Sequence, residues 1–222
     1  MIIAIDGTVS SGKSTAAKNV ARELGLLYIN TGLMYRAVAA YCLNSGIDTA
    51  NKEKVASLAK ELTIDLVNKE DGQHVFANGE DLTTQCKGPA VAKAVSDVAD
   101  NVEVRKHLVA EQRRLGLAAC PGAVMEGRDI GSVVFPDADI KFFITAPAEV
   151  RAHRRCLEFK ENGKNVPEEE VLRSVLERDK RDRERPVGAL IQLPEAIPLD
   201  TGDLTREEVT QKIVEHVNAA KS

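Results

Sequence analysis

The chain has 222 residues, of which 43% are hydrophobic, and this fits one large domain or a compact core with sizeable insertions. The net charge of −4 gives no global electrostatic case for nucleic-acid binding, although basic residues gather between Arg151 and Arg185 and leave room for a local anion site. The four cysteines are widely separated and no apolar run reaches the length of a membrane span, so we expect free thiols in a soluble, cytoplasmic protein with no nucleic-acid or membrane partner.

Short apolar runs alternate with helical patterns along the chain, which predicts crossover units and a parallel sheet. The first strand, Met1–Asp6, is continuous and aliphatic, as a sheet buried on both faces requires. A helix over Ser14–Leu24 follows and ends at Gly25. The other predicted core elements are strands at Leu26–Ile29, Val124–Glu126, Ile140–Thr145 and Ile197–Asp200, and helices from Leu33 to about Leu43, over Ala148–Lys160 after Pro147, and from Thr205 (in a capping box with Glu208) to about Ala219.

Two regions depart from this alternation. Thr63–Thr83 contains the hairpin signals Asp71-Gly72 and Asn78-Gly79, which predict a small antiparallel meander inserted into the core. The polar turn Glu161–Pro167 joins the helix Ala148–Lys160 to a second charged helix, Glu168–Arg185. Because this helical hairpin is so highly charged, it has little apolar face. We therefore expect it to project from the core and to move.

Residues 7–14 read Gly-Thr-Val-Ser-Ser-Gly-Lys-Ser, the pattern of a phosphate-binding P-loop, directly after a strand and before a helix. The glycines let backbone N–H groups approach phosphate oxygens, Lys13 supplies a mobile charge and Ser14 a hydroxyl ligand for Mg²⁺. The alternative is an accidental match, and the strand before and helix after it favour the loop. The predicted ATP-binding residues are Gly7, Thr8, Val9, Ser10, Ser11, Gly12, Lys13, Ser14 and Thr15.

A P-loop alone does not separate a kinase from a GTPase or a motor. The string Asn68-Lys69-Glu70-Asp71 spells the base-reading motif of GTPases, but it falls in the predicted meander and is interpreted as a chance match. The chain is also short for a motor.

A second group of charges lies near the end of the helix Glu168–Arg185. Arg178, Arg181, Asp182 and Arg185 follow helical spacing and share one face, where three guanidinium groups repel one another unless an anion is present. A solvated helix with ion pairs such as Glu177–Arg181 or Arg178–Asp182 is the alternative. Together with a P-loop, the cluster favours phosphoryl transfer, to which Arg151, Arg154 and Arg155 are further candidates.

Two polar loops follow predicted strands. Gly127-Arg128-Asp129 follows Val124–Glu126, and Asn30-Thr31-Gly32 with Tyr35-Arg36 follows Leu26–Ile29. Ligands of open α/β sheets bind at the carboxyl ends of strands, so both loops are candidates for acceptor binding, with plain turn chemistry as the alternative.

Over essentially its whole length the chain resembles the bacterial cytidylate kinases, a branch of the P-loop nucleoside monophosphate kinases. The resemblance rests on the P-loop and on these motifs: Thr31-Gly-Leu-Met-Tyr35-Arg36, Ala94-Val-Ser96 with Arg105, Gly127-Arg128-Asp129-Ile-Gly131-Ser132-Val-Val-Phe-Pro136-Asp137-Ala138, and Glu177-Arg178-Asp-Lys-Arg181-Asp182. The insert with the meander is similar to that family's enlarged monophosphate-binding domain. Thr8 stands where many members have Pro, Asn30 where Asp is common and Glu126 where Asp is frequent, which bears only on fine contacts.

The resemblance implies a three-layer α/β/α P-loop fold and transfer of the γ-phosphoryl group of ATP, with Mg²⁺, to CMP or dCMP. It implies a single domain made of a core (about 1–30, 108–150 and 186–222), a monophosphate-binding insert (about 31–107) and a helical lid (about 151–185), acting as a monomer. The implied catalytic residues are Lys13, Arg128, Arg178, Arg181 and Arg185. The implied CMP-binding residues are Thr31, Tyr35, Arg36, Ser96, Arg105, Arg128, Asp129, Arg178, Asp182 and Arg185.

Two other readings stay open at this point. Another small P-loop kinase, acting on UMP, AMP, shikimate or a coenzyme precursor, would share the fold and the lid. A non-catalytic nucleotide sensor or partner-binding ATPase would need the P-loop but not the clustered arginines.

Overall fold

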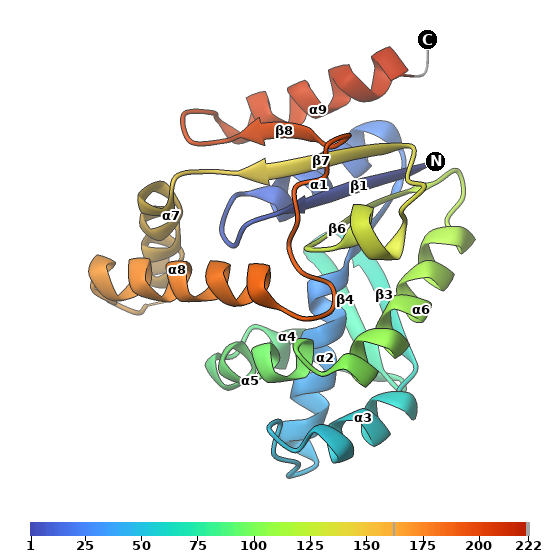
Figure 1. Cartoon of the computed structure of the whole chain (residues 1–222), viewed down its shortest axis with the longest axis vertical. Coiled ribbons are helices and arrows are strands. Elements are labelled where there is room, and N and C mark those ends of the chain that lie inside the picture. The colour runs from blue at the N-terminus through green and yellow to red at the C-terminus, as the bar shows by residue number, and fades with distance from the viewer. Residues whose placement is uncertain (162, 221–222) are drawn as a thin grey trace. The chain divides into compact units, whose positions relative to one another are not determined.

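The computed structural model describes residues 1–161 and 163–220, and the chain divides into two compact units. Unit 1 consists of Met1–Leu27 and Cys120–Ser222, and unit 2 of Tyr28–Ala119. The architecture is the predicted three-layer α/β fold, with a parallel central sheet and a separate small antiparallel sheet (Figure 1). Among the described helices, none is long and apolar enough to cross a membrane.

The parallel sheet of unit 1 is built around β1 (Ile2–Gly7), whose aliphatic side chains are buried. The strand β1 pairs in parallel with β6 (Ala123–Gly127) on one side and β7 (Ile140–Thr145) on the other, and β7 pairs with β8 (Ile197–Asp200). The strand β2 (Leu27–Asn30) begins beside β6, where the N–H of Leu27 donates to the carbonyl of Gly122. The predicted strands are confirmed, with bounds that differ by at most one residue at either end.

The helices α1 (Lys13–Leu24) and α9 (Arg206–Ala220) pack against each other and against the sheet (Figure 1). Small residues on α1 make this close packing possible, and Gly25 ends the helix in the left-handed conformation, φ 66°. At the start of α9, the hydroxyl of Thr205 accepts from the N–H of Glu208 while the Glu208 carboxylate accepts from Thr205. The predicted capping box is confirmed.

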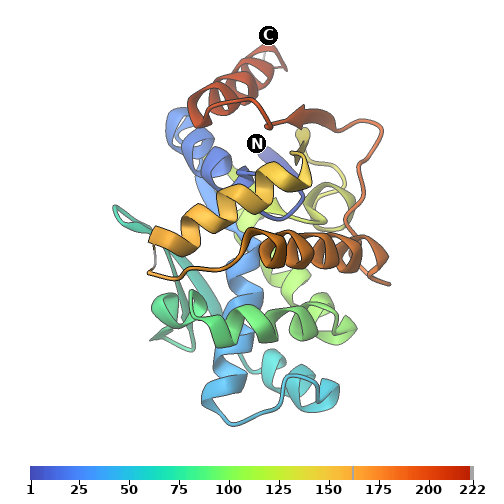
Figure 2. The ribbon, with the colours of Figure 1, turned by 90° about the vertical axis from the view of Figure 1, so that its left-hand side faces the viewer.

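The helices α7 (Ala148–Glu161) and α8 (Glu168–Glu184) lie side by side as a hairpin (Figure 2). The prediction that this hairpin has little apolar face is wrong. Ala152 and Cys156 on α7 and Val171 and Val175 on α8 form a buried cluster. Charged residues surround apolar positions spaced one helical turn apart, and composition alone hides that stripe. The predicted turn Glu161–Pro167 includes Asn162, which lies outside the described residues.

Unit 2 has its own hydrophobic core, built around α2 (Thr31–Asn44), which runs through the middle of the unit (Figures 1 and 2). The predicted meander is confirmed as an antiparallel sheet in the order β3-β4-β5, with Asn78 at φ 49° and Gly79 at φ 83° in its second turn. The sequence did not predict four helices. The other elements of unit 2 are α3 (Lys52–Lys60), β3 (Ile64–Lys69), β4 (Gly72–Ala77), β5 (Glu80–Asp81), α4 (Thr83–Cys86), α5 (Pro89–Ala99) and α6 (Val102–Ala118).

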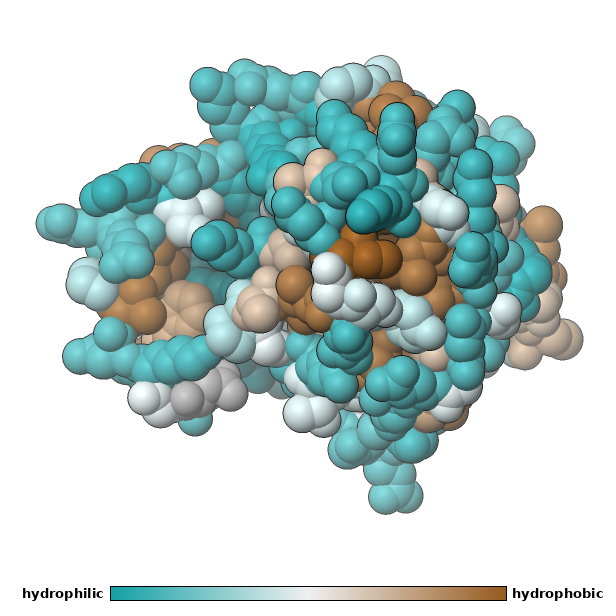
Figure 3. Space-filling view, turned by 90° about the horizontal axis from the view of Figure 1, so that it is seen from below, coloured by the Kyte–Doolittle hydropathy of each residue, from teal (hydrophilic) through white to brown (hydrophobic). Residues whose placement is uncertain are grey.

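The face shown in Figure 3 is mostly polar. All four cysteines are free thiols, as expected.

Candidate active site

The loop between β1 and α1 is held tightly against β7. The N–H of Thr8 donates to the carbonyl of Ile144, and a Cβ added to Gly7 would lie 1.9 Å from that same oxygen. Only glycine fits this close approach of two backbones. Farther along, Ser10 (φ 56°) and Gly12 (φ 83°) take left-handed conformations that turn the chain back into α1. The predicted P-loop is therefore present as a wrapped loop between a buried strand and a helix.

The polar side chains of the loop divide into two sets. The side chains of Thr8 and Ser11 are buried, and the Ser11 hydroxyl donates to the carbonyl of Thr8, so both shape the loop itself. Ser14 and Thr15 are exposed at the start of α1. Exposed hydroxyls and N–H groups at a helix N-terminus favour an anion there.

Lys13 is buried beside both the loop and a carboxylate. Its Nζ donates to the carbonyl of Thr8 at 3.3 Å and lies 3.8 Å from Oε2 of Glu126. The pKa of Lys13 is lowered to about 7, chiefly by burial and also by Arg128 and Arg178, while Glu126 and Asp182 act in the opposite direction. A phosphate in the loop would favour the charged form of this lysine.

Glu126 is a functional candidate that the sequence did not assign to the site. It is the last residue but one of β6 and is buried, and its Oε1 accepts a 2.6 Å hydrogen bond from the Ser14 hydroxyl. A hydroxyl and a carboxylate both offer oxygen ligands, which Mg²⁺ prefers. These residues therefore fit a magnesium ion delivered with ATP. The signal was available, because Glu126 is an acidic residue at the carboxyl end of a core strand.

Arg128 is fixed by an ion-pair group that joins the β6 loop to the end of α8. Its Nε donates to Oδ2 of Asp182 at 2.7 Å, and Nη2 of Arg185 donates to Oδ1 of the same carboxylate at 2.8 Å. Burial acts to raise the pKa of Asp182, but Arg128, Arg178 and Arg185 hold it below its usual value. The structure thus brings Arg128 together with Asp182 and Arg185, which the sequence had placed in a separate group.

The loop that carries Arg128 and Asp129 is anchored by Asp6. The two carboxylate oxygens of Asp6 accept hydrogen bonds from the N–H groups of Ile130 and Gly131, each at 2.8 Å. These residues begin a single π-helical turn, η1 (Ile130–Val134). Burial raises the pKa of Asp6 to about 6, although both backbone hydrogen bonds act to lower it. Asp6 was not predicted as part of the site, because its partners lie more than a hundred residues away in sequence.

The predicted arginine face of α8 is only partly buried. Asp182 and Arg185 are buried and Arg178 is half-buried, whereas Arg181 is exposed. Two arginines of α7 are already engaged by the protein, contrary to the expectation that they surround the transferred group. Arg151 pairs with Asp179, and Arg154 donates to the hydroxyl and the carbonyl of Thr201.

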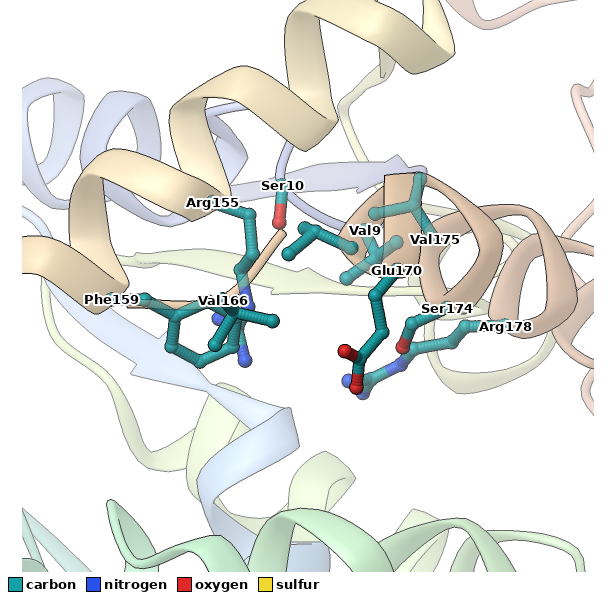
Figure 4. A pocket seen from close by; sticks show the side chains of 10 residues that line it. Val9, Ser10, Arg155, Phe159, Val166, Glu170, Ser174, Val175 and Arg178 are labelled. Carbon is teal, nitrogen blue, oxygen red and sulfur yellow. The ribbon is translucent and has the colours of Figure 1, made fainter. Parts of the chain in front are cut away.

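A pocket of about 230 Å³ lies between the P-loop and the hairpin (Figure 4). Val9 and Ser10 of the loop, Arg155 and Phe159 of α7, and Arg178 of α8 contribute to its lining. The guanidinium of Arg155 lies 5.0 Å from the centre of the Phe159 ring. The pocket offers both cationic and apolar surface beside the loop.

Five of the candidate residues lie in unit 2. The guanidinium of Arg105 is buried, lies 5.2 Å from the centre of the Tyr35 ring, and donates from Nη1 to the carbonyl of Ala99. Arg36 donates from Nη1 to the carbonyl of Cys86. Thr31, the first residue of α2, is buried, and Ser96 on α5 is half-buried. The structure brings Tyr35 and Arg105 together within this unit.

Comparisons with known proteins identify the family of the chain. The family model described as cytidylate kinase matches residues 3–219. The chain is 43% identical to a cytidylate kinase of Pelotomaculum thermopropionicum over 220 residues, which cover 99% of this chain and 96% of that one. It is 41% identical to a cytidylate kinase of Bacillus subtilis over 215 residues, which cover 97% and 95%.

The fold is also found in a solved structure of distant sequence. An uncharacterized protein from Eubacterium ventriosum aligns with a TM-score of 0.56 at 14% identity, covering 99% of both chains. That likeness shows the fold alone, and the family follows from the sequence matches. The chain belongs to the cytidylate kinase family of phosphotransferases.

Proposed function

We propose that the protein transfers the γ-phosphoryl group of ATP to CMP or dCMP, giving CDP or dCDP, with residues Gly7–Thr15 as the donor site. The observation that supports this most is the closeness of cations from three elements. Arg128 and Arg178 lie near enough to Lys13 to lower its pKa. Positive charge so concentrated in one unit suits two phosphate groups that must meet.

The roles of the residues follow from the charge of the reacting groups. Backbone N–H groups of the loop and Lys13 would bind the β- and γ-phosphates of the donor. Arg128 and Arg185, which both donate to Asp182, would bind the phosphate of the acceptor, with Arg178 nearby. Because donor and acceptor are both anions, alignment and neutralisation of charge are the main contributions that the protein makes.

Mg²⁺ would be held by Ser14, with Glu126 behind it, and would neutralise charge on the phosphates. The α7–α8 hairpin would act as the lid that excludes water from the donor. The division into core (about 1–30, 108–150, 186–222), insert (about 31–107) and lid (about 151–185) belongs to this proposal. The proposal also states that the protein is a cytoplasmic monomer without nucleic-acid or membrane partners. Light scattering of the purified protein gives its mass and so tests whether it is a monomer.

Further acceptor ligands are proposed from the family resemblance. Ser96, Arg105 and Asp129 would contact the cytosine, and Thr31, Tyr35 and Arg36 the acceptor phosphate or its surroundings. Arg181, which is exposed, is also proposed to contact the transferred phosphoryl group. Variants of Arg105 and Asp129 test the base contacts, because they should raise KM for CMP and leave KM for ATP unchanged.

A coupled assay for ADP with a panel of acceptors tests the function. We expect CMP and dCMP to stimulate ADP formation strongly above the rate without acceptor. Stimulation by UMP, AMP or shikimate without stimulation by CMP and dCMP would favour another small P-loop kinase. A slow rate that no acceptor changes would favour a nucleotide sensor and reject the proposal.

A further inference from the structure

One arginine at the base of the hairpin connects three segments of unit 1. Arg151, on the first turn of α7, donates from Nε to the carbonyl of Ala146 at 2.8 Å and from Nη1 to the carbonyl of Val9 at 3.2 Å. Its Nη2 lies 2.7 Å from Oδ2 of Asp179 on α8. The fork of a guanidinium makes these contacts simultaneously, which the ammonium of lysine does not. Arg151 therefore links the P-loop to both helices of the hairpin.

The pair is buried and incompletely satisfied. The side chains of Arg151 and Asp179 are 5% and 3% exposed. Oδ1 of Asp179 has no hydrogen-bond partner among the described residues. A buried ion pair is often no more stabilising than apolar residues of similar volume, and an unsatisfied carboxylate oxygen makes the balance worse. Stability alone therefore does not explain this arrangement.

On α8, Asp179 lies between two charged residues of the candidate site. It directly follows Arg178, which lines the pocket beside Val9, and it precedes by three residues Asp182, which pairs with Arg128. Fixing Asp179 to the carbonyl of Val9 through Arg151 therefore fixes one helical turn of α8 relative to the donor loop. That turn carries Arg178 and Asp182, two of the charged residues of the phosphate site proposed above.

We propose that Arg151 and Asp179 are a positioning pair that sets the distance between the P-loop and the charged end of α8, an inference that rests on the proposed kinase function. Neither residue contacts a phosphate in this role. The pair acts through Val9 on the loop and through Arg178 and Asp182 on α8. The distance matters because misplacing reacting groups by about 1 Å costs up to about 100-fold in rate.

The decisive experiment compares single variants with the double variant Arg151→Met/Asp179→Leu. Arg151→Met and Asp179→Leu should each lower the Tm and lower kcat about 10- to 100-fold, with KM for ATP changed less than about threefold. The double variant removes both charges, so its Tm should return close to that of the wild type while kcat stays low. A double variant that recovers kcat together with Tm would show a merely structural pair and overturn the proposal.

A variant that retains the charge guards against failure to fold. Arg151→Lys keeps a cation beside Asp179 but loses the fork to Val9 and Ala146, so it should keep a Tm near that of the wild type with kcat about tenfold lower. The matched control is Glu168→Gln, which removes the negative charge from the exposed contact between His153 and Glu168 that also joins α7 to α8. We expect no change in kcat there. Wild-type kcat in Arg151→Lys would contradict the proposal.

A readout without turnover separates this inference from the kinase function. Backbone amides of Val9–Gly12 and of Arg178–Asp182 should exchange hydrogen faster in Arg151→Met/Asp179→Leu than in the wild type, and at the wild-type rate in Glu168→Gln. If CMP and dCMP fail as acceptors but these amides respond, the proposed function fails and the coupling stands. Unchanged exchange in the double variant would refute the coupling itself.

Discussion

The hydroxyl of Ser14, on the P-loop, donates a 2.6 Å hydrogen bond to Oε1 of Glu126, at the carboxyl end of β6. The P-loop hydroxyl is the group that P-loop enzymes offer to the Mg²⁺ that accompanies ATP. Glu126 also lies 3.8 Å from Nζ of Lys13, so one buried carboxylate orients both side chains of the donor site.

Replacing Glu126 by Gln should weaken the use of Mg²⁺ more than the use of ATP. The amide keeps the size of the side chain but loses the negative charge, and outer-sphere partners of metal ligands are typically worth about 10- to 100-fold in metal affinity. We expect the free Mg²⁺ concentration that gives half-maximal rate to rise by about tenfold. The measurement is a Mg²⁺ titration of the initial rate at saturating ATP and CMP.

Glu126→Asp is the matched control for charge. It keeps the carboxylate on a shorter side chain, so its Mg²⁺ dependence should lie between those of the wild type and Glu126→Gln. Identical Mg²⁺ curves for wild type and Glu126→Gln would show that Glu126 does not support the metal.

Replacing Asp182 by Asn should damage both stability and acceptor use. Asp182 is the shared partner of Arg128 and Arg185, so its replacement by Asn removes the carboxylate charge that both guanidinium groups contact. Breaking a buried ion pair from one side costs about 3 kcal/mol or more. We expect a loss of that order in the free energy of unfolding, measured with urea. We also expect the KM of the variant for CMP to be higher than that of the wild type.

Arg183→Gln supplies the comparison, because Arg183 is an exposed neighbour on the same helix. It should leave the free energy of unfolding within about 0.5 kcal/mol of wild type. If CMP raises the urea midpoint of Asp182→Asn by as much as it raises that of the wild type at equal ligand concentration, Asp182 does not take part in acceptor binding.

Much of the unit 1 core was predictable, for a physical reason. Strands buried on both faces of a parallel sheet are continuous apolar runs, so β7 was predicted with the observed bounds. The bounds of β8 were also predicted, although this strand is only partly buried. The P-loop was predictable because phosphate binding restricts the residues of a short contiguous segment. The proximity of Arg128 to Asp182 was not, since the partners are 54 residues apart and only the tertiary fold joins them.

The helices α5 and α6 of unit 2 were missed although their signals are present. Pro89 stands at the first turn of α5, and Asn101 caps α6 by accepting from the N–H of Glu103. Both residue types also occur in turns, so a helix is indicated only if an apolar stripe follows. On α6 that stripe includes Arg105 and Gln112, which are buried polar residues and obscure the helical period.

Replacing Lys13 by Met should abolish transfer and leave the folded protein as stable as the wild type, or more stable. Burial disfavours the charged ammonium, as the pKa of about 7 indicates, whereas methionine fills similar space without charge. We expect kcat to fall by roughly 1,000-fold, in the range of losses when a main electrostatic contact to the transition state is removed. Steady-state kinetics and thermal unfolding without nucleotide measure both effects.

Lys18→Met tests whether loss of any lysine on α1 has this effect. Lys18 is exposed, so its replacement should leave kcat unchanged. A Lys13→Met enzyme that works near the wild-type rate would remove the electrostatic mechanism proposed for the loop.

Asp6 should make the stability of the protein fall as the pH rises from about 4 to about 6. Its pKa is raised from 3.8 to about 6 in the folded protein, so the folded state binds the proton more tightly than the unfolded state does. The stability contribution of the protonated form is therefore fully present below pH 3.8 and is lost as the pH rises through about 6. Carboxyls with lowered pKa values, such as Asp81 at about 2, act in the opposite direction and at lower pH.

The variant Asp6→Asn isolates this contribution because asparagine has nearly the same size and does not ionise. It accepts only one of the hydrogen bonds from Ile130 and Gly131, so it should be less stable than the wild type at pH 4. The gap should narrow by up to about 3 kcal/mol between pH 4 and pH 7, because a shift of one pKa unit corresponds to about 1.4 kcal/mol. Urea unfolding of both proteins at intervals across this range gives the two curves. Parallel curves would mean that Asp6 ionises normally and that the loop bearing Arg128 is anchored by a carboxylate at every pH tested.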